Sequence, residues 1–191
     1  MQARVNRFQA KADRVDDGQT VFQDAFRRDV EGFEDGLLLV DRQSGEAMMI
    51  TLWRNEQARD DSLSVASEVL QRAADTMEGR PERQDYEVVE HRPGQNRRYA
   101  RVSTGQVELS WFDQPDASTI IDAASQQPGY AGFLVLADRE NSRIIGMSFW
   151  DNQEHLEASE SGYYTQEMDK SRDQFVNQQW ERRVYEVLAQ R

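Results

Sequence analysis

Residues 36–55, GLLLVDRQSGEAMMITLWRN, contain two apolar segments joined by a short polar turn. The first segment, residues 37–40, is apolar throughout, and Gln43-Ser44-Gly45-Glu46 is typical of a hairpin turn. In the second segment, residues 47–53, neither face of an extended strand carries a charge. A sheet that is apolar on both faces must be covered on both. We therefore predict a β-hairpin with helices on one face and a second layer on the other.

The same pattern recurs 97 residues further along the chain. Residues 133–152 read FLVLADRENSRIIGMSFWDN, so that Trp150 aligns with Trp53. The alignment runs without a gap from residue 3 to residue 62, and it places Ala3-Arg4-Val5 on Ala100-Arg101-Val102. After a slip of two residues, the segment ERQDYEVV that starts at Glu82 aligns with ERRVYEVL. We interpret the chain as a tandem duplication.

The duplication predicts two domains of similar size with a linker between them. The turn-rich sequence Pro93-Gly94-Gln95-Asn96 marks the junction. We assign residues 1–92 to the first repeat, residues 93–98 to the linker, and residues 99–191 to the second repeat.

Each half has the predicted order β-α-β-β-α-β, which is the ferredoxin-like unit. Hydrophobic periodicity separates the strands from the helices. In the first half we expect strands at 3–9, 36–41, 47–53 and 86–90, and helices around 21–30 and 63–77. In the second half we expect strands at 100–110, 133–138, 144–150 and 184–189, and helices around 120–124 and 156–175. Because helices can cover only one face of each sheet, the predicted fold class is α+β, with tandem ferredoxin-like repeats packed sheet to sheet.

Several segments resemble the antibiotic biosynthesis monooxygenase-like group of dimeric α+β barrels. In the second half, PGYAGF at residues 128–133 leads into an apolar strand followed by Asp138-Arg139, and the next strand ends in FWDN at residues 149–152. The first half has the weaker matches GFEDG at residues 32–36 and LWRN at residues 52–55. The resemblance covers nearly the whole chain, as two fused copies.

The resemblance implies that two ferredoxin-like units pack sheet to sheet, a pairing that the family usually makes between separate chains. Here both units would come from one chain and form an intramolecular dimeric α+β barrel. The superfamily includes oxygenases, haem degraders, isomerases and proteins without known activity, so the resemblance specifies a fold rather than a reaction. Its cofactor-independent oxygenases pair the strand tryptophan with an upstream asparagine, and this chain has Met49 and Gly146 at those positions.

Trp53 and Trp150 end equivalent predicted strands and are candidate substrate-binding residues. An indole at that place can stack on a flat aromatic substrate, or it can simply fill the core. The asparagines two residues later, Asn55 and Asn152, precede the long helices. Asparagine is among the best helix N-caps, so we predict that role for both.

The second half has more room beside its tryptophan than the first. Gly146 and Ser148 replace Met49 and Thr51, which are larger. We therefore place the candidate pocket in the second half, lined by four side chains: Trp150, Ser148, Tyr163 and Tyr164. The two tyrosines fall in the middle of a predicted helix, where each either hydrogen-bonds a ligand or packs in the core.

The residue inventory excludes several kinds of site. The chain has no cysteine and two histidines, which excludes disulfides, thiolate chemistry and cysteine- or histidine-rich metal centres. Haem-degrading relatives carry an axial histidine on the long helix, and His155 falls only in its first turn. We predict that the protein binds neither metal nor another cofactor, and we find no glycine-rich phosphate loop and no hydrolase elbow motif.

Charge and hydropathy limit the kinds of partner that the chain is expected to bind. The net charge of −12, from 35 acidic and 23 basic residues, disfavours nucleic-acid binding. No apolar run approaches the roughly 20 residues of a membrane span, and the N-terminus does not resemble a signal peptide. We expect a cytoplasmic protein with a small lipophilic or aromatic ligand, and a homo-oligomer is possible.

Two classes of function remain at this level. The first is a small, cofactor-independent monooxygenase that acts on a lipophilic, aromatic metabolite, in which the substrate itself activates oxygen. The second is a non-catalytic binding or structural module that retains the fold after one copy of the duplicated unit has drifted. A haem-degrading relative is a third and weaker hypothesis.

Overall fold

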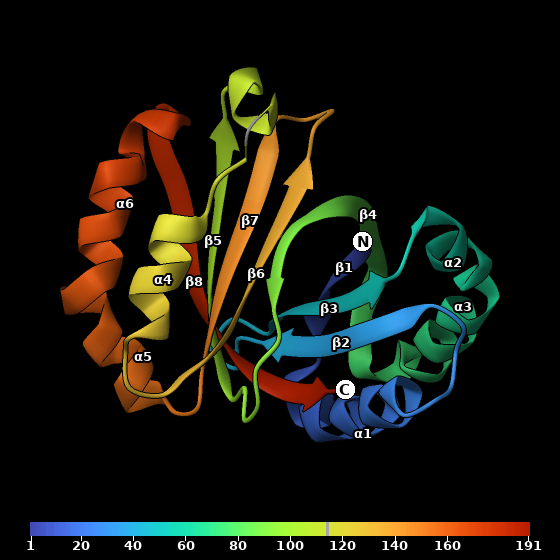
Figure 1. Ribbon diagram of the computed structural model, residues 1–191. Helices are drawn as coiled ribbons and strands as arrows, with labels where there is room; N and C mark the ends of the chain where they lie inside the picture. The colour runs from blue at the N-terminus through green and yellow to red at the C-terminus, as the bar shows by residue number, and fades with distance from the viewer. Residues whose placement is uncertain (114) are drawn as a thin grey trace. The chain divides into compact units, whose positions relative to one another are not determined.

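The computed structural model describes residues 1–113 and 115–191, apart from the side chains of Tyr163, Met168, Ser171, Gln174, Asn177, Gln178 and Gln179. The chain divides into two compact units (Figure 1). Unit 1 comprises residues 1–87 and 185–191, and unit 2 comprises residues 88–184. Strands β4 (Met77–Arg92) and β8 (Phe175–Gln190) contribute to both units.

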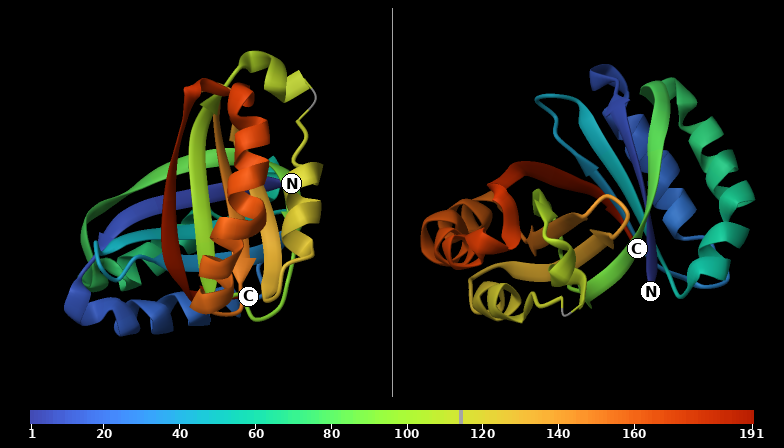
Figure 2. Two further views of the ribbon diagram at one scale, coloured as in Figure 1. Left: turned by 90° about the vertical axis from the view of Figure 1, so that its left-hand side faces the viewer. Right: turned by 90° about the horizontal axis from the view of Figure 1, so that it is seen from above.

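Unit 1 is an antiparallel sheet with helices on one face (Figures 1 and 2). Its strand order is β4-β1-β3-β2-β8, and the end of β8 pairs with β2. The elements that lie wholly inside unit 1 are β1 (Gln2–Ala10), α1 (Val15–Phe26), β2 (Phe33–Val40), β3 (Glu46–Trp53), α2 (Glu56–Asp61) and α3 (Leu63–Arg72).

Unit 2 repeats this arrangement with the strand order β8-β5-β7-β6-β4. Figure 2 shows α4, α5 and α6 on one face of its sheet. The elements of unit 2 are β5 (Tyr99–Val107), the 3-10 turn η3 (Leu109–Asp113), α4 (Ser118–Ser125), β6 (Tyr130–Asp138), β7 (Arg143–Trp150), α5 (Gln153–Ser159), the π-turn η4 (Glu160–Tyr164) and α6 (Thr165–Ser171).

Hydrogen bonds between the described strands give one continuous order, β1-β3-β2-β8-β5-β7-β6-β4, which closes because β4 also pairs with β1. The predicted α+β class is confirmed, with a closed barrel order of eight strands. Within the described part of the chain, no helix is both long enough and apolar enough to cross a membrane.

Several predicted boundaries were wrong, and the largest errors concern the last strand of each unit. Met77 and Phe175 were expected at helix ends, but each begins a 16-residue strand. Their apolar side chains fit the helical spacing, yet α3 stops at Arg72 and a 3-10 turn follows. There the Thr76 hydroxyl donates to the Ala73 carbonyl at 2.7 Å, which favours the turn over a further helical turn.

Other elements are also shorter than expected. A separate short helix, α2, precedes the long helix predicted for residues 63–77, and the two are separated at Ser62, whose hydroxyl donates to the Arg59 carbonyl at 2.6 Å. The first strand of the second half ends at Val107, because residues 109–113 form a 3-10 turn. Val30 lies beyond the end of α1.

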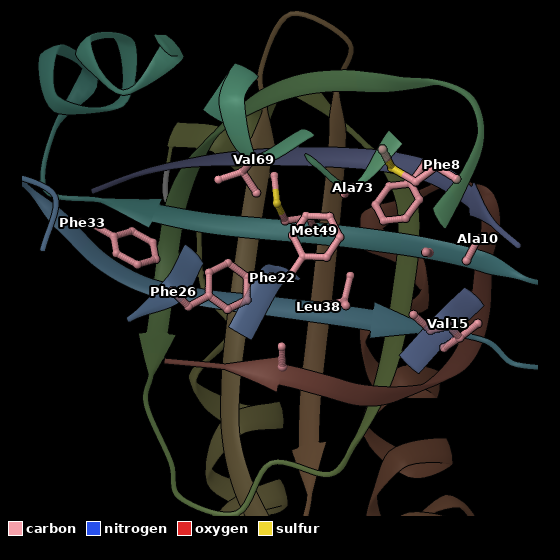
Figure 3. Packing of buried hydrophobic residues seen from close by; sticks show 14 of the residues in the cluster. Phe8, Ala10, Val15, Phe22, Phe26, Phe33, Leu38, Met49, Val69 and Ala73 are labelled. Carbon is pink, nitrogen blue, oxygen red and sulfur yellow. The ribbon is translucent and has the colours of Figure 1, made fainter. Parts of the chain in front are cut away.

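The core of unit 1 lies between the sheet and its helices. Figure 3 shows Phe22 and Phe26, one helical turn apart in α1, packed among Leu38 and Met49 of the sheet. On the opposite face of β2, Leu37 is also buried, with 1% of its surface exposed. Both faces of this strand are therefore buried, as the apolar sequence pattern predicts.

Several local features occur at equivalent positions in the two units. Strands β3 and β7 have bounds 97 residues apart. The side chains of Asn55 and Asn152 accept hydrogen bonds from backbone amides three residues later, at 2.9 and 2.8 Å, so both predicted N-caps are confirmed. Gly32 and Gly129 share a φ of +74°, where side chains are disfavoured, and an added Cβ would collide with the helix that follows.

Candidate functional site

A cavity in unit 2 lies between the sheet and its helices, and its floor is made by three neighbouring strands. Strand register places side chains from β5, β7 and β6 side by side in two rows. The rows are Arg101–Ser148–Phe133 and Ser103–Gly146–Val135, and all six residues line the cavity. The floor is therefore polar along β5 and apolar along β6.

The walls of the cavity come from other segments of the same unit. They are Trp111 of η3, Asp116, Ala117 and Ile120 at the start of α4, Ile144 of β7, Tyr164 of η4 and Phe175 of β8. The cavity has an empty volume of about 650 Å³, its open mouth included. Such a mostly apolar pocket with a few polar groups is typical of small-molecule sites.

Arg101 is the charged residue on the cavity floor, and only 1% of its surface is exposed. Its Nη2 donates to the Leu156 carbonyl at 2.6 Å and to the Ser159 hydroxyl at 2.9 Å. Its Nε lies 3.2 Å from Oε2 of Glu160, which also forms an ion pair with Arg182. These contacts satisfy a charge that would otherwise be costly to bury.

Tyr164 brings a hydroxyl to the same side of the cavity. Its oxygen lies 2.5 Å from Oγ of Ser103, and its ring lies under the Arg101 guanidinium. Burial raises the pKa of Tyr164, although the hydrogen bond with Ser103 and the positive charge of Arg101 act in the opposite direction. The phenol is therefore protonated at neutral pH and can donate a hydrogen bond.

Trp150 lies in the core beside the cavity, on the same face of β7 as Ser148, with 0% of its surface exposed. Its Nε1 donates to Oγ of Ser148 at 3.1 Å, so it connects to the cavity through that serine. In unit 1 the equivalent Trp53 donates to Oγ1 of Thr51 at 3.0 Å. The two tryptophans thus occupy equivalent core positions and orient the hydroxyl of the residue two positions earlier.

The structure brings together some of the residues that the sequence singled out. Ser148 and Tyr164 line the unit 2 cavity, whereas Trp53 lines a separate pocket in unit 1. The side chain of Tyr163 lies outside the described residues. Arg101 and Ser103 also line the cavity but were not predicted from the sequence as site residues. An arginine between Ala100 and Val102, on a strand with apolar neighbours, was the signal that could have identified this position.

Unit 1 has a pocket at the equivalent place, with an empty volume of about 460 Å³ including its mouth. Arg4, Met49 and Thr51 line it, where unit 2 has Arg101, Gly146 and Ser148. Arg4 donates to the Ser62 hydroxyl at 3.1 Å, which matches the contact of Arg101 with Ser159. The two pockets therefore share the buried arginine and its hydrogen bond to a serine, and they differ in the residue at the centre of the floor.

The centre of the floor is open in unit 2 and filled in unit 1. A Cβ added to Gly146 would meet no atom within 4 Å, and the backbone there does not require glycine. Met49 occupies the corresponding place and is itself buried. The glycine therefore leaves room for a ligand against the strands of unit 2.

The histidines do not fit the role of a haem ligand in this cavity. His155 lies in the first turn of α5, where its Nδ1 is 2.7 Å from Oδ1 of Asp151 and 2.9 Å from Nδ2 of Asn152. Neither His155 nor His91 is among the described residues that line the cavity. In the described ranges, 1–113 and 115–191, no three His, Asp or Glu side chains gather as a metal site.

Comparison with known protein sequences gives two relatives of low identity. No family model matches the chain. Two uncharacterized proteins of Mycobacterium tuberculosis, from strains CDC 1551 and H37Rv, are each 24% identical over 165 residues, covering 81% of this chain and 73% of the relative. Because both relatives are uncharacterized, they indicate no function for this chain.

Solved structures are more informative about the fold. A proposed monooxygenase from Fusobacterium nucleatum superimposes with a TM-score of 0.78 at 12% identity, covering 99% of this chain and 93% of the other. One from Lactobacillus acidophilus gives 0.75 at 14% identity, covering 97% and 92%. A ferredoxin-fold protein from Listeria monocytogenes, related to antibiotic biosynthesis monooxygenases, gives 0.59 at 10% identity, covering 97% and 94%. The fold is that of the antibiotic biosynthesis monooxygenase-like proteins. The resemblance inferred from the sequence is thus confirmed for the fold.

Proposed function

We propose that the cavity of unit 2 binds a small, flat, lipophilic or aromatic molecule. The observation that carries this proposal is the open space above Gly146, at the centre of a floor that is apolar on one side and polar on the other. A ring laid on the strands would contact Val135 and Ile120. The hydroxyl of Ser148 would orient it from the polar side.

A titration tests the binding directly. We expect 2-methoxynaphthalene, a neutral flat probe, to quench tryptophan fluorescence saturably, because Trp111 lines the cavity. Gly146→Met places in unit 2 the side chain that fills the floor of unit 1, so it should abolish the quenching. Met49→Leu, which changes the side chain at the centre of the unit 1 floor, is the matched control and should leave the quenching unchanged. Equal binding by the wild type and Gly146→Met would contradict the proposed site.

We further propose that the bound molecule is the substrate of a cofactor-independent monooxygenase reaction. The monooxygenase-like fold and a buried polar edge beside an apolar cavity support this. In such a reaction a CH₂ group of the substrate becomes a carbonyl, one atom of O₂ enters the product and the other leaves as water. The substrate supplies all four electrons. The hydrogen-bonded Ser103 and Tyr164 hydroxyls would hold the proton that is moved.

A binding module without catalysis is the alternative function. An oxygen electrode distinguishes the two functions. With anthrone, a tricyclic ketone that has a reactive CH₂ group, a monooxygenase consumes O₂ in proportion to the anthrone oxidised and faster than the reaction without protein. A protein that binds anthrone without accelerating O₂ uptake is a binding module. The haem-degrading hypothesis has less support, because the described residues that line the cavity include no histidine. A haemin titration with a sharp Soret shift that is lost in His155→Ala would support that hypothesis.

We also propose that the chain arose by tandem duplication, with repeats at residues 1–92 and 99–191, and that their sheets pack on each other as an intramolecular barrel. The paired N-caps, the paired indole hydrogen bonds and the buried second face of β2 support this. The full chain should sediment as a monomer, whereas residues 1–92 alone should self-associate. A folded, monomeric fragment 1–92 would contradict the sheet pairing, and a dimeric full chain would favour a homo-oligomer.

A further inference from the structure

We infer that the ligand of the unit 2 cavity carries an anionic oxygen, a carboxylate or an ionised phenol, which the Arg101 guanidinium binds. The inference rests on the proposed function, because it concerns the chemistry of the molecule in that same cavity. It follows from three features of the floor: the buried charge, the positions of the nearby carboxylates, and an excess of hydrogen-bond donors.

The first feature is the placement of the charge. Arg101 lies on β5 between two buried apolar residues, and its side chain lines the cavity while being shielded from solvent. Electrostatic interactions of a buried charge are weakly screened by salt and water. A hydrogen bond between a guanidinium N–H and an anionic oxygen is also stronger than one between neutral groups. An anionic group on the ligand would thus gain more here than at an exposed arginine.

The second feature is that the neighbouring carboxylates are more exposed than Arg101. Glu160 forms ion pairs with both Arg101 and Arg182, and its side chain is 34% exposed. Asp116 also lines the cavity, is exposed, and accepts a hydrogen bond from the Ser118 amide at 2.8 Å. Glu160 is shared between two arginines, so these three side chains carry two positive charges and one negative charge, and solvent screens the exposed Asp116.

The third feature is the direction of the hydroxyl hydrogens. Indole nitrogen can only donate, so Oγ of Ser148 accepts from Trp150 and keeps its own hydrogen to donate. In the Ser103–Tyr164 pair either oxygen can be the donor of the shared hydrogen, and the Tyr164 oxygen also accepts a hydrogen bond from the indole of Trp180. These donors line the same side of the cavity as Arg101. An anionic oxygen, which only accepts, complements this edge.

The test compares probes of the same ring and different charge by calorimetry on the full chain. The probes are 2-naphthoate, its neutral methyl ester, and 2,4-dinitro-1-naphtholate, a phenol that is ionised at neutral pH. We expect the wild type to bind 2-naphthoate about 10-fold or more tightly than the ester, the size of effect expected for a hydrogen bond to a charged group. If the naphtholate also binds tightly, the site accepts both carboxylates and ionised phenols. If the naphtholate does not bind, the site is selective for carboxylates.

Variants connect that preference to the named residues. Arg101→Gln should reduce naphthoate affinity by about 10-fold or more and leave ester affinity within about 3-fold. Arg4→Gln, at the equivalent buried position of unit 1, is the matched control and should change neither. If Arg101→Gln does not fold, Glu160→Gln gives the same information, because removal of a partly exposed negative charge should tighten naphthoate binding and not ester binding.

The outcomes distinguish a failure of the anion inference from a failure of the proposed binding site. Equal affinity for naphthoate and ester in the wild type would overturn the anion inference and keep the proposed binding site. An anion preference unchanged in Arg101→Gln and in Glu160→Gln would also overturn it. Failure of every probe to bind would overturn the proposed function and the inference with it.

Discussion

Arg101 and Tyr164 stack on one another in unit 2, with the guanidinium carbon 4.4 Å from the centroid of the ring. The equivalent arginine of unit 1, Arg4, forms an ion pair with Asp85 of β4 at 3.2 Å, and Arg101 forms one with Glu160 of η4 at the same distance. Both units therefore pair the buried arginine with a carboxylate. In unit 2 the arginine also stacks on an aromatic ring at the edge of the cavity, where planar stacking favours arginine over lysine.

Truncation of the buried tryptophan should destabilise the protein whether or not it is an enzyme. Trp150→Ala removes a fully buried side chain, and such truncations cost about 3 to 5 kcal/mol in the free energy of unfolding. For a chain of this size the melting temperature should fall by roughly 2 to 4 °C per kcal/mol. Calorimetric melting measures this. Trp150→Phe, which retains a ring, should cost less, and an unchanged melting temperature in Trp150→Ala would contradict the core position.

Loss of either N-cap should have similar consequences in the two units. Asn55→Ala and Asn152→Ala each remove one side chain–backbone hydrogen bond at a helix start. We expect each to lower the free energy of unfolding by about 1 kcal/mol, measured by urea denaturation. Gln57→Ala, on the exposed surface of the same first turn, is the control and should have little effect. A large cost at one asparagine and none at the other would argue against equivalent helix starts.

The stability of the protein at alkaline pH should depend on the buried phenol of Tyr164. Because burial raises the pKa of Tyr164, the folded chain retains this proton at pH values where the unfolded chain loses it. The resulting stabilisation is fully present below the ordinary tyrosine pKa of about 10 and is lost as the pH rises through the higher folded value. Urea midpoints between about pH 8 and pH 11 should therefore fall more steeply for the wild type than for Tyr164→Phe.

A second buried tyrosine serves as the comparison for that experiment. Burial also raises the pKa of Tyr130, which packs edge-on against Trp150 outside the cavity. Tyr130→Phe should remove a separate share of the alkaline destabilisation. If both variants keep the wild-type slope, neither phenol is protected from ionisation by the fold.

Much of the fold could be predicted because local pattern and tertiary packing agree there. The hairpin at residues 36–55 is apolar on both faces in the sequence and buried on both in the structure. The long strands β4 and β8 could not be predicted in the same way. β4 carries charged residues along most of its length, so only the end near Tyr86 shows a strand pattern. Pairing with β1 extends it far beyond that signal.

The candidate site was only partly predictable for a different reason. Ser148 and Gly146 stood out because the two halves differ there, and both line the cavity. Arg101 is shared with Arg4 in the first half, so the comparison between halves gave no contrast at that position. Its role depends on Tyr164 and Glu160, about sixty residues away in sequence, whose positions only the fold specifies.

A crystal structure of the protein soaked with 2-naphthoate tests the central claim most directly. We expect the naphthalene ring to lie on β7 over Gly146, with its carboxylate within hydrogen-bonding distance of Arg101 and Ser148, and the Met49 pocket to remain empty. Density for the probe only in unit 1, or in unit 2 with the carboxylate directed away from Arg101, would contradict the account.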